Sequence, residues 1–152
     1  MAAGTKLKVL VVDDEVAIRI LLTTVLQKSD YEVLEAADGA ALRELLNGPQ
    51  PEVVLLDLKL PDADGLELLP QIKKVWPGSE IIVLTGNATI DAAVAATKLG
   101  AYDFQKKPFD PNALLLAIER AIEHKVLTEE ASTLRHALAT ISGGASPIFQ
   151  SQ

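Results

Sequence analysis

Carboxylates follow two apolar segments of the chain, and a lysine follows a third segment with strand-like composition. Asp13-Asp14-Glu15 comes directly after residues 8–12, Asp57 comes directly after residues 53–56, and Lys107 precedes a proline. The carboxyl ends of parallel strands open onto one edge of a sheet, so we expect these side chains to meet there. Such an edge could bind a cation and a phosphoryl group.

The acidic residues predict a site for a hard divalent cation. Two unit charges 4 Å apart repel each other by about 4 kcal/mol at an effective dielectric constant of 20, and a cation removes that cost. Ligands that are all oxygens favour Mg²⁺, which commonly binds one or two carboxylates, waters and a substrate phosphate. The chain has no cysteine, and His124 and His136 fall on the last predicted helix, where we expect surface positions. A zinc site is therefore disfavoured.

A carboxylate can also act as a nucleophile and form an aspartyl-phosphate. The charge of the phosphoryl group would then be neutralised by the metal, by Lys107, and by donors such as Thr85 and Gly86 at the end of another apolar segment.

Strand-like and helix-like segments alternate along the chain, which predicts an α/β fold. The predicted strands span residues 8–12, 32–36, 53–56, 81–85 and 101–105. Helical patterns lie between and after them. Asp38 and Thr89 are expected to cap the second and fourth helices, Gly100 to end the fourth, and Asp110 with Pro111 to begin the fifth. Pro70 falls inside the third helix, where it removes a backbone hydrogen bond.

Repeated strand–helix units imply a parallel, doubly wound sheet with right-handed crossovers. In the flavodoxin-like strand order 2-1-3-4-5, ligands bind between the first and third strands. Those are the strands that end at Asp13-Asp14 and at Asp57.

Length, composition and charge limit the possible classes of protein. The chain has 152 residues, which suffice for one ordinary core and an appendage. Its formal charge of −7 argues against non-specific binding to nucleic acid. It shows neither a long apolar run nor a basic-then-apolar start, so we expect a cytoplasmic protein without membrane contact.

Several motifs, in this order and spacing, resemble the receiver domain of two-component response regulators over roughly residues 6–123. They are Val11 to Glu15, Leu55 to Asp62, Gly65-Leu66, Leu84 to Gly86, Gly100 to Phe104 and Lys107 to Phe109. The resemblance implies that Asp57 accepts a phosphoryl group from a sensor histidine kinase. It also implies that Mg²⁺ is held by Asp13, Asp14, Asp57 and the backbone carbonyl of Lys59.

The same resemblance implies a switch formed by Thr85 and Phe104, with Lys107 contacting the phosphoryl group. Phe104 stands where a tyrosine is frequent and offers no hydroxyl. Each residue also has a plainer interpretation: Asp13 and Asp14 could cap the first helix, and Phe104 could belong to the core. The hypothesis rests on the conjunction of the motifs.

The last part of the chain predicts a dimerising helix. Apolar residues recur at spacings of four and three, which is the heptad pattern of a coiled coil. This heptad seam comprises Leu127, Ala131, Leu134, Leu138 and Ile141. We therefore divide the chain into a receiver domain (1–123), a linker helix (124–142) and a flexible tail (143–152). The tail residues 146–150 resemble the opening of the AAA+ ATPase domain of sigma-54-dependent activators.

The leading hypothesis is a phosphorylation-controlled switch rather than an enzyme, one that catalyses only its own phosphotransfer and slow dephosphorylation. It would control sigma-54-dependent transcription through domains absent from this chain, which would also make any contact with DNA and polymerase. It would form a homodimer through the last helix and the face of the fourth and fifth helices. The alternatives are a stand-alone phosphorelay receiver and an Mg²⁺-dependent phosphohydrolase with an aspartyl-phosphate intermediate.

Overall fold

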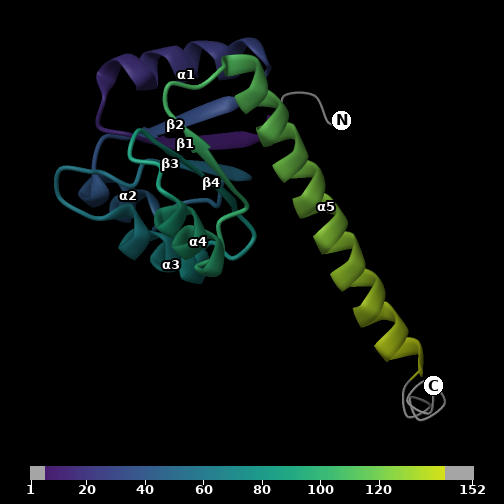
Figure 1. Ribbon diagram of the computed structural model, residues 1–152. Helices are drawn as coiled ribbons and strands as arrows, with labels where there is room; N and C mark the ends of the chain where they lie inside the picture. The colour runs from purple at the N-terminus through teal and green to yellow at the C-terminus, as the bar shows by residue number, and fades with distance from the viewer. Residues whose placement is uncertain (1–5, 143–152) are drawn as a thin grey trace.

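The computed structural model describes residues 6–142, and in them a five-stranded parallel sheet lies between two layers of helices (Figure 1). The strand order β2-β1-β3-β4-β5 confirms the predicted fold. The strands are β1 (Lys8–Val12), β2 (Glu32–Ala36), β3 (Val53–Leu56), β4 (Glu80–Thr85) and β5 (Asp103–Lys106). The helices are α1 (Val16–Lys28), α2 (Gly39–Leu45), α3 (Gly65–Val75), α4 (Ile90–Lys98) and α5 (Pro111–Ser142).

The three central strands are apolar because helices cover both of their faces. One core cluster lies under α1 and α5 and includes Leu22, Leu26 and Ile118. The other lies under α2, α3 and α4 and includes Leu42 and Ile72. The two clusters hold the central strands rigidly between them, so the residues at the strand ends have fixed positions.

The strand register places the two acidic positions side by side. Val12 of β1 is paired with Leu56 of β3, so Asp13 and Asp57 follow at the same level of the sheet. Backbone hydrogen bonds continue the pairing past the strand ends, with the N–H of Asp57 donating to the carbonyl of Val12 at 2.9 Å.

The boundaries of two strands and one helix differ from the prediction. β4 begins one residue earlier, at Glu80, and α3 begins at Gly65. β5 spans residues 103–106 rather than 101–105, because this edge strand is only half buried and mixes polar with apolar residues. The predicted caps are confirmed: Asp38 and Thr89 accept from backbone N–H groups of α2 and α4, and α5 begins at Pro111.

The last helix runs without a break from the α/β body into the predicted linker (Figure 1). The domain boundary at residue 123 therefore falls inside one helix and stays a prediction. His124 Nδ1 contacts Glu80 Oε2, and its ring centroid lies 5.1 Å from that of Tyr102. His124 is an exposed residue of the last helix, as expected, and its contact with Glu80 also joins α5 to the start of β4.

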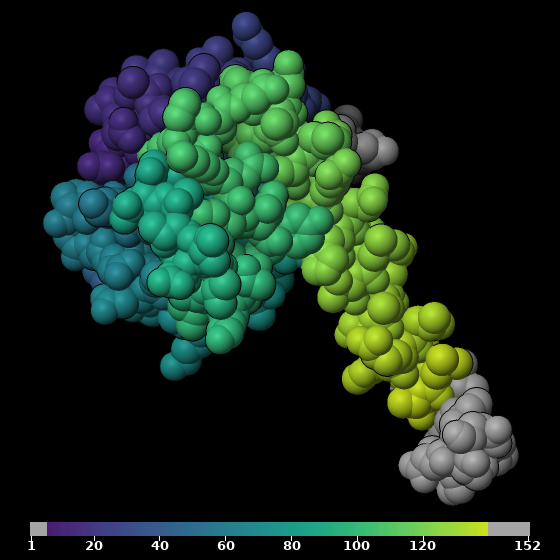
Figure 2. All heavy atoms as spheres, in the orientation of Figure 1, coloured from purple at the N-terminus to yellow at the C-terminus, as the bar shows by residue number. Residues whose placement is uncertain are grey.

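The C-terminal part of α5 extends away from the rest of the molecule (Figure 2). Leu127, Leu134 and Leu138 of the heptad seam are exposed, while the side chain of Ile141 and the tail 143–152 lie outside the residues whose side chains are described. Within residues 6–142, no helix combines the length and the apolar character needed to cross a membrane.

Helix α3 continues through Pro70, which lies on its exposed face. We predict that Pro70→Ala stabilises the protein by about 1 to 3 kcal/mol, because alanine restores a backbone N–H donor inside the helix, partly offset by a more flexible unfolded chain. Urea unfolding would measure the change. Gln71→Ala, at the neighbouring exposed position, is the control, and an equal or lower stability for Pro70→Ala would contradict the prediction.

Candidate functional site

Three aspartates converge at the carboxyl edge of the sheet. Asp13, Asp14 and Asp57 each offer a carboxylate oxygen, and these oxygens lie within 4.8 Å of one another. Asp13 and Asp57 are buried, whereas Asp14 is exposed. Asp13 and Asp57 directly follow β1 and β3, and Asp14 comes directly after Asp13. The core fixes the register of both strands, so it also fixes the positions of these aspartates.

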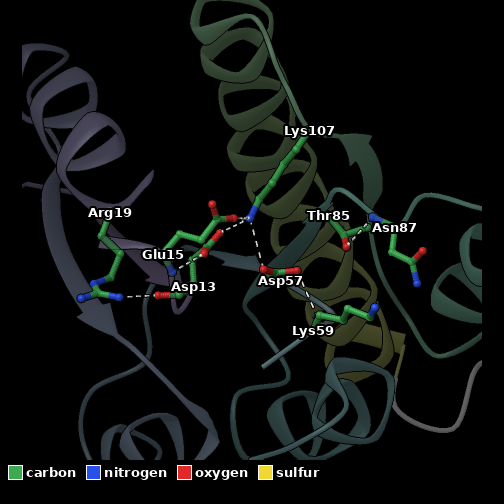
Figure 3. Close-up of polar contacts among 8 residues, drawn as sticks. All are labelled: Asp13, Glu15, Arg19, Asp57, Lys59, Thr85, Asn87 and Lys107. Carbon is green, nitrogen blue, oxygen red and sulfur yellow. Dashed lines mark hydrogen bonds and ion pairs between the residues drawn. The ribbon is translucent and has the colours of Figure 1, made fainter. Parts of the chain in front are cut away.

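Lys107 lies among these carboxylates and binds several of them at once (Figure 3). Its Nζ donates to Asp13 Oδ2 at 2.6 Å, to Glu15 Oε1 at 3.0 Å and to Asp57 Oδ2 at 3.1 Å. Burial alone would lower the pKa of Lys107, but the hydrogen bonds to Asp13 and Glu15 outweigh it and raise the pKa above its ordinary value. Lys107 is therefore a permanent cation at the site.

The electrostatics of the cluster fit a bound divalent cation. Burial raises the pKa of Asp13, and the hydrogen bonds from Lys107 and from the N–H of Glu15 oppose this shift without cancelling it. One ammonium group thus faces several carboxylates, and negative charge remains in excess. The donors are all oxygens, which suits Mg²⁺, and Asp13, Asp14 and Asp57 are the residues that could hold it.

The loop after β3 fixes the backbone of Asp57. The N–H of Lys59 donates to Asp57 Oδ1 at 3.1 Å, and the N–H of Gly65 donates to the carbonyl of Leu58 at 2.8 Å. A Cβ at Gly65 would lie 2.6 Å from the Cα of Leu58 and 2.7 Å from the carbonyl oxygen of Asp57. Only glycine permits α3 to start this close to the Asp57 backbone.

A surface pocket of about 680 Å³ opens over this cluster, and the predicted phosphate-binding residues line it. Asp14, Asp57, Lys59, Thr85, Gly86 and Lys107 all belong to the lining. Thr85 is fully buried, and its Oγ1 accepts a hydrogen bond from the N–H of Asn87 at 3.2 Å. Phe104 is not in the lining. It is half buried against the core cluster beneath α2, α3 and α4.

Sequence reasoning missed two side chains that support the site. Glu15 was noted as acidic but given no role, although it binds Lys107 directly. Arg19 donates to the carbonyl oxygen of Asp13 at 2.6 Å and pairs with Glu35 at 3.3 Å. The helix-cap interpretation of the acidic pair is not what is observed, because the N-cap of α1 is Glu15 and it makes no capping hydrogen bond.

Comparisons with known proteins agree with this geometry. The response regulator receiver domain family matches residues 9–119. The chain is 35% identical over 142 residues to the DNA-binding transcriptional regulator NtrC of Proteus hauseri, covering 92% of this chain and 30% of that protein. It is 34% identical over 118 residues to sporulation initiation phosphotransferase F of Bacillus subtilis, covering 78% of this chain and 95% of that protein.

A solved structure has the same fold. The beryllofluoride-activated NtrC4 receiver domain dimer, solved in solution, superposes with a TM-score of 0.72 at 39% identity, covering 78% of this chain and 98% of that one. The chain thus spans about 30% of the length of the first regulator and nearly all of a single receiver.

We predict that Gly65→Ala displaces the Asp57 loop and destabilises the protein by roughly 1 to 3 kcal/mol, because the added methyl group meets backbone atoms that cannot rotate away. Thermal unfolding measures the stability, and the amide chemical shifts of residues 57–59 report the local displacement. Gly86→Ala is the matched control, since a Cβ there meets nothing within 4 Å. Equal effects of the two substitutions would show that the close approach of α3 is unimportant.

Proposed function

Because the chain belongs to the response regulator receiver family, we propose that it is a phosphorylation-dependent switch whose phosphoacceptor is Asp57. The observation that carries the proposal is the Asp57 carboxylate, which is buried, lines the pocket, lies within hydrogen-bonding distance of Lys107 and stands beside two further aspartates. In the reaction, a carboxylate oxygen of Asp57 attacks the phosphorus of a phosphohistidine. The new O–P bond forms as the P–N bond breaks, and the electron pair returns to the imidazole of the kinase.

Each neighbour of Asp57 has a role that follows from its chemistry. Asp13, Asp14, Asp57 and the carbonyl of Lys59 would hold Mg²⁺. The bound ion would neutralise the charge on the phosphoryl oxygens. Lys107 supplies a permanent positive charge, which a phosphoryl group on Asp57 would attract away from Asp13. Thr85 can donate its hydroxyl to a phosphoryl oxygen, because its Oγ1 only accepts from Asn87. With these roles, the chain would catalyse only the transfer of a phosphoryl group to its own Asp57 and the slow loss of that group.

The switch is proposed to couple Thr85 to Phe104. Thr85 is the last residue of β4. Phe104 lies on the adjacent strand β5 and pairs with Val83 of β4, so the side chains of Thr85 and Phe104 lie on neighbouring strands. Movement of the Thr85 hydroxyl toward a phosphoryl oxygen would open space beside it for the ring of Phe104. The surface of α4, β5 and α5 would change as a result.

The output is proposed to lie in further domains of a longer cytoplasmic regulator, of the sigma-54-dependent activator class, with a sensor histidine kinase as the phosphoryl donor. The likeness to the regulator NtrC over 30% of its length supports this context. A homodimer would transmit the signal, since α5 presents the exposed seam leucines and a related receiver is a dimer in its activated form. Val94 of α4 and Leu99, the residue that caps the end of α4, are exposed and would lie near the partner subunit.

A stand-alone phosphorelay receiver is the second candidate. Its support is the match over 95% of the sporulation phosphotransferase, which is scarcely longer than the receiver itself. Dimerisation through the heptad seam would distinguish the two candidates. A regulator with further domains would use a dimerising helix, whereas a stand-alone relay receiver needs none. Family membership favours both over the phosphohydrolase alternative.

We predict that acetyl phosphate with Mg²⁺ adds one phosphoryl group to the wild-type chain and none to Asp57→Asn, because the amide is not a nucleophile. Intact-mass measurement reports the added group. Asp14→Ala should also abolish labelling through loss of the metal, whereas Asp91→Asn, an exposed aspartate of α4, should label normally. Full labelling of Asp57→Asn would refute the assignment.

We predict that Leu134→Asp dissociates the homodimer, because a charge replaces one of several seam leucines, each worth roughly 1.5 to 3 kcal/mol when buried. Analytical ultracentrifugation measures the dimer dissociation constant. Ser132→Asp introduces the same charge at an exposed position of the same helix outside the seam, and should leave the dimer intact. A dimer of wild-type strength in Leu134→Asp would eliminate the coiled coil and favour the receiver face instead.

A further inference from the structure

Asp62, in the loop between β3 and α3, binds the N-terminus of a different helix. Its Oδ1 accepts from the N–H of Gly39 at 2.7 Å, and its Oδ2 accepts from the N–H of Ala40 at 3.0 Å. The hydrogen bond from Gly39 is the main reason that the pKa of Asp62 is lowered. The side chain is thus an ionised clamp between the loop and α2.

The surfaces joined by this clamp fit closely. A Cβ at Gly39 would lie 3.0 Å from the Cβ of Ala63 and 3.1 Å from Asp62 Oδ1. The loop therefore occupies the space that a side chain at Gly39 would need. Asp62 and Ala63 of the loop therefore pack directly against Gly39, the first residue of α2, although Asp62 and Gly39 are 23 residues apart in the sequence.

The same loop reaches the phosphoacceptor at its other end. Lys59 donates its N–H to Asp57 Oδ1, and it pairs with Asp64 in an isolated antiparallel bridge. The N–H of Leu60 donates to the carbonyl of Ala63 at 3.3 Å, which closes the turn that contains Asp62. A displacement of the outer end of this small turn would therefore move Lys59.

We propose that Asp62 is a positioning residue for the phosphorylation site. It fixes the turn against α2, so that Lys59 keeps its N–H on Asp57 and presents its carbonyl as a ligand of Mg²⁺. The inference rests on the proposed function, because the position of Lys59 matters only where the site binds Mg²⁺ and a phosphoryl group. Asp62 itself touches neither.

The chain contains a matched control for this role. Asp38 also accepts from a backbone N–H of α2, that of Ala41 at 2.8 Å, but it lies in the segment before α2 and makes no contact with the loop through this bond. Asp62→Ala and Asp38→Ala each remove a carboxylate from the start of the same helix. A difference between them at the site therefore reports the loop and not the stability of α2.

The experiment measures Mg²⁺ affinity by calorimetric titration and the amide chemical shift of Lys59 by NMR, in the full chain. Asp62→Ala should weaken Mg²⁺ binding by about tenfold or more, as is usual when support of a metal ligand is lost, and should shift the Lys59 amide. Asp38→Ala should leave both unchanged. Asp62→Asn, which keeps one acceptor oxygen, should fall between Asp62→Ala and wild type and guards against simple misfolding.

The two proposals fail in distinguishable ways. If wild type, Asp62→Asn, Asp62→Ala and Asp38→Ala all bind Mg²⁺ with the same affinity and show the same Lys59 amide shift, the positioning role is wrong. The assignment of Asp57 as phosphoacceptor would survive that result. If wild-type protein binds no Mg²⁺ and Asp57 takes no phosphoryl group from acetyl phosphate, the proposed function is wrong and the role of Asp62 is overturned with it.

Discussion

Repulsion among carboxylates at the edge of the sheet is the constraint on which the rest of the structure depends. Asp13 and Asp57 are withdrawn from water, where each would be best solvated, and are placed beside Asp14 and a single ammonium group. Such an arrangement persists only because the buried strands of the sheet fix the residues that carry it. The stability of the core thus opposes the electrostatic cost of the site, and any ligand that supplies positive charge relieves that cost.

The supports of the site fall into two groups with different physical origins. The strands place Asp13 and Asp57 through register, which is collective and insensitive to single contacts. The other supports act through individual hydrogen bonds: Arg19 of α1 holds the carbonyl of Asp13, and the N–H of Lys59, in the loop after β3, holds the carboxylate of Asp57. Such supports can be adjusted one residue at a time without disturbing the sheet, so the chemistry of the pocket can be tuned separately from the fold.

Much of the architecture was predictable because it follows from local patterns. Apolar runs identify the central strands, and residues directly after them must share an edge, which was enough to bring Asp57, Thr85 and Lys107 together. Contacts between distant side chains and backbone groups leave no such pattern. The pairing of Asp62 with Gly39 and that of His124 with Glu80 were therefore missed. The edge strand β5 was misplaced by up to two residues because partial burial gives it no clear alternation.

Because α5 is uninterrupted, a change in its tilt near the contact between His124 and Glu80 would displace its far end. The part of the helix beyond His124, 125–142, is about 27 Å long at roughly 1.5 Å per residue. A tilt of about 5° near His124 would therefore carry the far end through about 2 Å, with no change inside the helix itself. Small adjustments of the sheet and of Glu80 would be magnified with distance. Whatever follows the helix in the chain would then sense an angle rather than a contact.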